Sequence, residues 1–202
     1  RALSANGDDQ IYAGITAANE LIALLSNVSG KAKPIAVFAA AQWLWDNRKM
    51  SIVVIGNFDG VHKGHQQILN RAKEIAGDEK IVALTFDPHP VSIFAPERTP
   101  TLLTILSDKI ELLKIHNADQ VAVIKFTKEF AAMSPEDFVK KVLVEQLKAS
   151  KVIVGQNFTY GFKAEGNVQS LTQHKEFETI ILDLQSDEAE TISSTRIRKA
   201  II

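Results

Sequence analysis

The stretch GNFDGVHKGH, residues 56–65, most constrains the fold of this chain, because it joins an apolar run to a helical pattern. The run before it, residues 51–55, reads SIVVI. The segment after it places apolar residues at helical spacing, namely Ile68, Leu69, Ala72, Ile75 and Ala76. Glycines at Gly56, Gly60 and Gly64 permit a sharp turn and a close approach of a ligand to the backbone. These residues are therefore predicted to form the turn between a β-strand and an α-helix.

From Ser51 onward, short β-branched runs alternate with amphipathic segments. The predicted strands are residues 51–55, 80–86, 120–126, 151–154 and 179–182, and the predicted helices are residues 62–76, 107–116 and 135–148. Ser134, followed by Pro135, is typical of the start of the last helix. This alternation predicts an α/β fold with a mostly parallel sheet and right-handed crossovers. In such sheets ligands bind beyond the carboxyl ends of the strands, which is where GNFDGVHKGH falls.

Composition narrows the class of protein and of partner. The 202 residues are 46% hydrophobic, which is enough for one good core. The 23 Lys and Arg nearly balance the 24 Asp and Glu, so no overall field attracts nucleic acid or an anionic membrane. The absence of cysteine excludes disulfides and thiolate metal sites, and a cytoplasmic location is predicted. No stretch approaches the roughly 18 apolar residues of a membrane span, so no membrane partner is expected.

His62 and His65 lie three residues apart at the predicted helix start, so they project from the same side of its first turn. A helix N-terminus offers unpaired N–H groups and a partial positive charge, both of which attract phosphate. Neighbouring negative charge in turn favours a protonated imidazole. The pattern suits a nucleoside triphosphate. Two other interpretations stay open: the histidines could cap the helix and touch solvent, or bind zinc, although no third zinc ligand is evident.

The stretch TISSTRIRKA, residues 191–200, places hydroxyl side chains and two arginines ahead of a possible terminal helix. Hydroxyls and N–H groups at a helix start, together with planar guanidinium donors, suit phosphate oxygens. The same pattern is also ordinary helix-start chemistry with surface arginines. Two such segments on one α/β sheet favour the phosphate interpretation.

Together with three further segments, these two resemble the adenylyltransferase module of the bacterial FAD synthetase family. The further segments are TFDPHP at 85–90, VGQNFTYG at 154–161 and the trailing Gly166; ISSTRIR at 192–198 completes the family's order. The similarity runs from about Ser51 to the final residue and includes the connecting LLTILSDKIELLK and SPEDFVKKVLVEQL. It implies a Rossmann-like nucleotidylyltransferase fold with a mostly parallel sheet. The first 49 or so residues lie outside the resemblance, and IYAGIT and ELIALLSNVSGKAKPIAVF predict two or three short strands there, a small N-terminal β appendage.

The resemblance implies transfer of AMP from ATP to FMN, giving FAD and pyrophosphate in the presence of Mg²⁺. His62 and His65 would stabilise charge on the α-phosphoryl group, and Arg198 would hold the departing phosphates. Asn157 would help to hold phosphate or metal, which makes the implied catalytic set His62, His65, Asn157 and Arg198. The implied ATP-binding set is Gly56, Phe58, Asp59, Gly60, His62, Gly64, His65, Ser194, Thr195 and Arg198. The implied FMN-binding set is Phe86, Asp87, Pro88, His89 and Asn157.

Several of these residues have a second interpretation. Asp59 could meet Mg²⁺, or could fix its turn by bonding its own backbone, and the turn role is favoured. Residues 87–90 could be no more than a rigid turn, since two prolines fix the backbone there. Phe86, at a strand end, could belong to the core, and Tyr160 could contact adenine or pack within its loop.

The domain prediction divides the chain into a small β appendage at 1–41, a linker at 42–50 and an FMN adenylyltransferase domain at 51–202. Residues 1–40 faintly resemble the C-terminal end of a B-type tRNA pseudouridine synthase without its catalytic portion, so no pseudouridine synthesis is expected. Family members usually continue into a riboflavin kinase domain, which this sequence lacks, so FMN would have to be supplied. The alternative functions are adenylyl or cytidylyl transfer to another phosphate acceptor, and non-catalytic binding of a flavin, a nucleotide or RNA. Oligomeric state and metal preference are not predicted.

Overall fold

The computed structural model describes residues 11–12, 50–183 and 194–201. Its central sheet has the strand order β1-β4-β3-β2-β5-β8. The strands are β1 (Ile11–Tyr12), β2 (Ser51–Ile55), β3 (Lys80–Asp87), β4 (Gln120–Lys125), β5 (Ala149–Gly155) and β8 (Glu178–Leu182). All neighbours pair in parallel except β1, which is antiparallel to β4. The predicted mostly parallel α/β sheet is therefore confirmed, and each of its five predicted strands lies within two residues of its predicted bounds.

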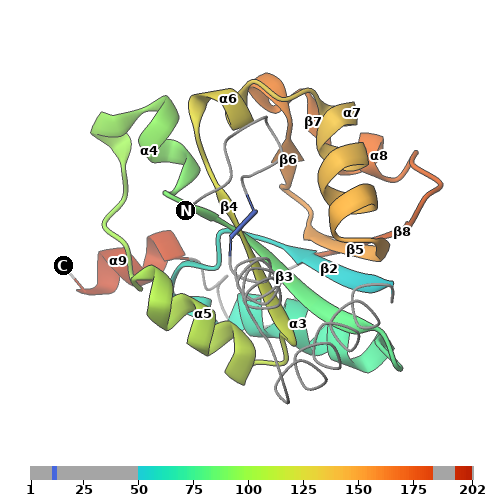
Figure 1. Ribbon diagram of the computed structural model, residues 1–202. Coiled ribbons are helices and arrows are strands. Elements are labelled where there is room, and N and C mark those ends of the chain that lie inside the picture. Colours follow the sequence, from blue (N-terminus) through green and yellow to red (C-terminus); the bar gives the residue numbers. More distant parts are fainter. Residues whose placement is uncertain (1–10, 13–49, 184–193, 202) are drawn as a thin grey trace, which may run out of the picture.

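Helices connect these strands on both faces of the sheet (Figure 1). The α-helices are α3 (Lys63–Ile75), α4 (Pro90–Phe94), α5 (Leu106–Ile115), α6 (Lys128–Ala131), α7 (Pro135–Asp137), α8 (Val168–Leu171) and α9 (Ser194–Ile201). Short 3-10 turns lie at Asp59–Val61, Pro96–Arg98 and Phe162–Ala164, and a small antiparallel ladder joins β6 (Thr159–Tyr160) to β7 (Gly166–Asn167). The predicted helices at 62–76 and 107–116 correspond to α3 and α5.

The predicted helix at 135–148 differs in its hydrogen bonding. It begins as predicted, because the Ser134 side chain accepts a hydrogen bond from the backbone N–H of Asp137. After α7, however, residues Phe138–Gln146 (η4) form a π-helix instead of continuing as an α-helix. The apolar spacing cannot distinguish the two, since both bury one stripe of side chains.

Successive side chains of each strand point to opposite faces of the sheet, so the core forms two layers. One face of the sheet packs against the layer of α6, α7, η4 and α8, and its core contains Val53, Ile55, Val82, Leu84, Phe138, Val142 and Leu171. The other face packs against α3 and α5, and its core contains Ile52, Val54, Ile81, Ala83, Leu69 and Leu113. Figure 1 shows these helix layers above and below the sheet. The sheet is thus buried on both faces, as parallel sheets are.

The strand order places a topological switch point between β2 and β5. From β2 the chain moves through β3 to β4 on one side, and it then returns to β5 on the other side of β2. The connections leaving β2 and β5 therefore diverge, and a crevice opens at the carboxyl ends of these strands. GNFDGVHKGH follows β2, and the segment containing Asn157 follows β5.

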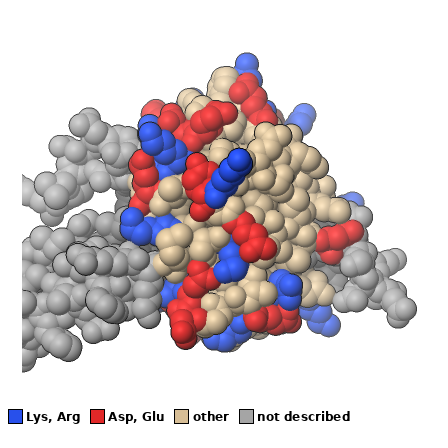
Figure 2. Space-filling view, turned by 90° about the vertical axis from the view of Figure 1, so that its right-hand side faces the viewer, with Lys and Arg blue, Asp and Glu red and all other residues tan. Residues whose placement is uncertain are grey.

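At the N-terminal end, Ile11 and Tyr12 of the predicted β appendage form β1, which pairs with β4 at the edge of the sheet. The rest of the predicted appendage and linker lies outside the described residues, so the division into domains stays a prediction. In Figure 2, acidic and basic side chains alternate on the visible face rather than gathering by sign. Within the described part of the chain, no helix has the length and apolarity needed to cross a bilayer.

Candidate active site

The loop after β2 has a fixed backbone. The backbone N–H of Gly56 donates to the Leu84 carbonyl at 3.1 Å, and the Thr85 hydroxyl donates to the Asn57 carbonyl at 3.1 Å. Phe58 follows in the left-handed region, at φ 50° and ψ 27°, with its side chain fully buried. Gly60 has φ +76°, and a Cβ there would lie 2.9 Å from Leu103 Cδ1, so a larger residue would be strained at this position. The loop thus presents its residues to the crevice in one conformation.

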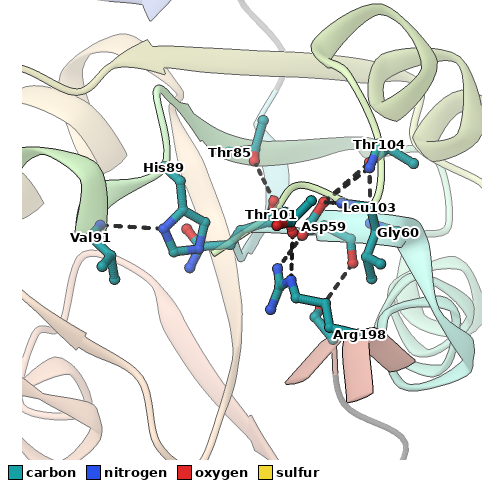
Figure 3. A network of polar contacts seen from close by, with 11 residues as sticks. Asp59, Gly60, Thr85, His89, Val91, Thr101, Leu103, Thr104 and Arg198 are labelled. Atoms are coloured by element: carbon teal, nitrogen blue, oxygen red, sulfur yellow. Dashed lines mark hydrogen bonds and ion pairs between the residues drawn. The ribbon is translucent and has the colours of Figure 1, made fainter. Parts of the chain in front are cut away.

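Asp59 joins this loop to two distant segments (Figure 3). Its Oδ1 accepts hydrogen bonds from the backbone N–H groups of Leu103 at 2.9 Å and Thr104 at 3.2 Å, and its Oδ2 forms an ion pair with Arg198 Nη2. The Asp59 carbonyl also accepts from the Ser194 hydroxyl at 2.9 Å. The side chain therefore fixes a loop 44 residues away and the helix α9, rather than its own turn as the sequence suggests.

His62 and His65 form a stacked pair at the start of α3. Their ring centroids are 3.6 Å apart with an interplanar angle of 20°, so they lie on one side of the first turn, as predicted. His62 is the residue before the first helical residue, and its side chain does not cap the helix. Both Nδ1 atoms are buried and have no hydrogen-bond partner among the described residues. The pair therefore offers polar atoms that a bound anion could satisfy.

Burial keeps these imidazoles neutral in the free chain. Burial, followed by the nearby His62 and Lys109, lowers the pKa of His65 to about 3. Burial also lowers the pKa of His62, although Asp59 opposes this shift. A polyphosphate beside the pair would act against both shifts, because negative charge favours the protonated ring. The protonated state that the sequence suggests would then depend on the ligand.

A cavity of about 610 Å³ lies over this pair, and we call it the polar cavity. Its lining brings the two predicted phosphate segments together, since it includes His62 and His65 from one and Ser194, Thr195 and Arg198 from the other. Gly56, Phe58, Asp59 and Asn157 also line it, whereas Gly60 and Gly64 do not. The two segments that are predicted to bind phosphate therefore face one space.

A second cavity, of about 350 Å³, adjoins the first, and we call it the aromatic cavity. Its lining is mainly aromatic and apolar: Phe86, Phe94, Phe126, Phe130, Met133, Phe138, Phe158 and Tyr160. Several of these rings meet edge to face, for example Phe86 and Phe126 at 5.7 Å between centroids. Four residues line both cavities: Gly56, Asn57, Asn157 and Phe158. The cavities therefore meet at the carboxyl ends of β2 and β5, which is the switch point of the sheet.

The predicted FMN-binding set is divided between these cavities. Phe86 lines the aromatic cavity, Asn157 lines both, and Asp87 and Pro88 line neither. His89 lines the polar cavity instead, where burial and then the Arg198 charge lower its pKa. The Nδ1 of His89 accepts a hydrogen bond from the Val91 backbone N–H at 3.3 Å, so the neutral ring carries its proton on Nε2. His89 thus offers the polar cavity a neutral N–H donor.

Sequence reasoning missed most of the aromatic cavity and one junction residue. In the sequence, Phe126, Phe130 and Phe138 look like core residues. They lie in different segments, which come together around one cavity only in the folded chain. Asn57 is the second residue of GNFDGVHKGH, and no role was predicted for it. Ligands bind at the carboxyl ends of parallel strands. This rule points to Asn57, two residues after the end of β2, and to Phe126, the first residue after β4.

Comparisons with known proteins agree with this geometry. The model of the FAD synthetase family matches residues 45–196. A bifunctional riboflavin kinase/FMN adenylyltransferase of Listeria monocytogenes is 39% identical over 155 residues, which are 74% of this chain and 49% of that protein. The protein of the same name from Escherichia coli K12 is 30% identical over 155 residues, with 74% and 50% coverage. The chain thus spans about half the length of these curated relatives.

One solved structure has a fold similar to that of this chain. A Streptococcus pneumoniae crystal structure described as a macrolide-efflux protein superposes with a TM-score of 0.66 and 29% sequence identity, covering 75% of this chain and 52% of that one. Since the family model covers three quarters of the sequence, the chain belongs to the FAD synthetase family.

Proposed function

We propose that this chain transfers AMP from ATP to FMN, giving FAD and pyrophosphate. The observation that carries the proposal is the meeting of a polar cavity and an aromatic cavity at the switch point of one sheet. A reaction that joins a nucleotide to a flavin needs two such spaces with their reactive ends together. Family membership supports the same reaction.

The polar cavity takes the ATP triphosphate in this proposal. The His62 and His65 rings at the start of α3 line one side, and the first N–H groups of a helix lack partners within the helix. Ser194 and Thr195, at the start of α9, line the other side with the Arg198 guanidinium. Two positive helix ends and a cation suit an anion with several charges. The resemblance assigns the α-phosphoryl group to the imidazoles and the leaving phosphates to α9.

The aromatic cavity takes the three-ring system of FMN. Its volume of about 350 Å³ lies within the range of small-molecule sites, and its Phe and Tyr side chains offer flat apolar contact. Burial raises the pKa of the Tyr160 phenol, whose hydroxyl pairs with Ser170 at 3.1 Å, so Tyr160 stays neutral. With the rings in this cavity, the flavin phosphate points to the junction with the polar cavity.

The chemistry is an in-line displacement at phosphorus. An oxygen of the FMN phosphate attacks the α-phosphorus of ATP, the new P–O bond forms, and the bond to the bridging oxygen of pyrophosphate breaks with its electron pair. No protein nucleophile is needed, so the residues act by positioning and by stabilising charge. Imidazoles that gain protons when phosphate binds would stabilise the negative charge at the α-phosphoryl group.

The side chains that could serve as metal ligands determine where Mg²⁺ would be held. Among the described residues, no group of three or more His, Asp or Glu side chains is arranged to bind a metal ion. A Mg²⁺ ion keeps several waters and needs few protein ligands when phosphates are present, and the Asn157 side-chain oxygen at the junction is a suitable donor. The cavity therefore fits a metal held mainly by the phosphates, which would neutralise their charge when bound.

The direct test is incubation of the chain with ATP, FMN and Mg²⁺, followed by chromatography for FAD. We expect FAD and an equal amount of pyrophosphate. Riboflavin in place of FMN should give no product, because it lacks the attacking phosphate. The absence of FAD with FMN at saturating substrate would reject the proposal. Cytoplasmic location and the lack of a nucleic-acid partner remain predictions from the sequence.

A further inference from the structure

We propose that Asn57 binds the phosphate of the flavin substrate at the junction of the two cavities. The proposal deepens the proposed function, since it assigns a residue to the acceptor phosphate. Asn57 lines both cavities, as does Asn157 on the neighbouring strand connection. The two asparagines thus approach the junction from β2 and β5, which are paired strands.

The backbone of Asn57 is fixed while its side chain is exposed. The Asn57 carbonyl accepts from Thr85, whose side chain is fully buried in the sheet. The next residue, Phe58, anchors the loop in the core, and its ring lies 3.1 Å from the position of a Cβ on Gly56. The Asn57 side chain is exposed at the end of this anchored segment. A donor on such a backbone is positioned before the ligand arrives.

The other asparagines show why the Asn57 amide is available. Asn70 and Asn117 hydrogen-bond to each other at 2.9 Å, and Asn167 caps α8 by accepting from the Ser170 backbone N–H. Among the five asparagines in residues 50–183 and 194–201, the side chains of Asn57 and Asn157 have no hydrogen-bond partner within the described part of the chain. These two are also the asparagines that line the cavities. Their amides are therefore free to bind a ligand.

An uncharged donor suits this position. The acceptor phosphate must approach the α-phosphorus, and a lysine or arginine at the junction would bind both phosphates strongly. An amide N–H donates in one direction to one oxygen and adds no charge that would hold the substrate in place. Asn57 would thus orient the attacking phosphate, while His62 and Arg198 act on the ATP side.

Flavin titrations of Asn57→Asp test this assignment. The substitution keeps the shape of the side chain and replaces an N–H donor by a negative charge. We expect the Kd for FMN to rise by about tenfold or more, because two negative charges then meet in a partly enclosed site. The Kd for riboflavin, which has the same rings and no phosphate, should change by less than about twofold. Fluorescence quenching of each flavin measures both values.

Asn70→Asp is the matched control, since Asn70 is exposed on α3, lies outside both cavities and can still accept from Asn117 as an aspartate. It should bind both flavins as the unchanged chain does. Asn57→Gln, which restores an amide, should recover part of the FMN affinity. In steady-state assays Asn57→Asp should raise the KM for FMN more than the KM for ATP.

The outcomes separate this inference from the proposed function. Equal loss of affinity for FMN and riboflavin in Asn57→Asp would overturn the inference, because the residue would then shape the ring site. Unchanged affinity for FMN would overturn it as well. A chain that distinguishes the two flavins through Asn57 but forms no FAD would reject the proposed function and leave the phosphate contact standing.

Discussion

Arg198 Nη2 forms an ion pair with Asp59 Oδ2 across 139 positions of the sequence, and this pair joins α9 to the loop after β2 (Figure 3). Arg198 Nε also donates to the Thr101 carbonyl at 2.7 Å. Both side chains are largely buried, with 16% and 2% of the Arg198 and Asp59 side chains exposed. The same contacts hold Ser194 and Thr195 at the polar cavity, so the ion pair links stability to the geometry of the site.

Removing Asp59 should therefore destabilise the fold. Asp59→Ala leaves the Arg198 guanidinium without its partner and two backbone N–H groups without their acceptor. We expect the free energy of unfolding to fall by about 3 kcal/mol, the scale for breaking a buried ion pair. Urea denaturation measures this change.

The control for Asp59→Ala is an exposed ion pair. Arg71 and Glu74 lie 2.8 Å apart on α3, with 48% and 62% of their side chains exposed. Glu74→Ala should cost about 0.5 kcal/mol, because water and salt screen such pairs. A similar cost for both variants would show that the Asp59–Arg198 pair does not hold the site together.

His62→Ala tests the imidazole pair. His62 lines the polar cavity and stacks on His65, whereas its side chain caps no helix. We expect the rate of FAD formation to fall by about a hundredfold or more, the scale for losing a preorganised charge stabiliser. Thermal unfolding should change little. Equal rates in both proteins would remove His62 from the mechanism.

The buried His65 predicts a pH dependence of stability. Its pKa is about 3 in the folded chain, against 6.5 for a free imidazole, so between these values the unfolded chain binds a proton that the folded chain does not. Stability should therefore fall as the pH decreases from about 6.5 towards 3. In His65→Gln, the Tm should fall less steeply over this range. Parallel Tm profiles for the two proteins would contradict the burial of a neutral His65.

Gly166 tests the aromatic cavity separately. A Cβ at Gly166 would lie 2.7 Å from the ring of Tyr160, which lines that cavity. Gly166→Ala should displace the ring and raise the Kd for FMN by about tenfold, while the Kd for ATP stays the same. Calorimetric titration with each ligand measures both values. A loss of ATP affinity alone would show that Gly166 does not act through the flavin site.

The sequence predicted the sheet well, because buried parallel strands read as short β-branched runs. It also predicted that residues 62 and 65 project together, since that depends only on helical spacing. The π-helix at 138–146 was missed because its apolar pattern fits an α-helix as well. The short helices α4, α6 and α8 were missed because elements of four or five residues carry little periodicity.

The site was less predictable where it depends on contacts distant in sequence. The partners of Asp59 lie 44 and 139 positions away, so a local turn rule gave the wrong partner. His89 is the cap residue at the start of α4, and it lines the polar cavity, as Arg198 does, instead of the aromatic cavity. In contrast, both segments that line the polar cavity could be selected from the sequence, because their residue types and helix-start positions are visible there.

The most direct measurement of adenylyl transfer follows the α-phosphorus itself. The chain is incubated with FMN, Mg²⁺ and ATP labelled at the α-phosphorus, and the products are separated. The account predicts that the label appears in FAD at the rate at which unlabelled pyrophosphate is released. Label that stays in ATP, or that leaves as free AMP while FMN is unchanged, would contradict transfer between the two cavities.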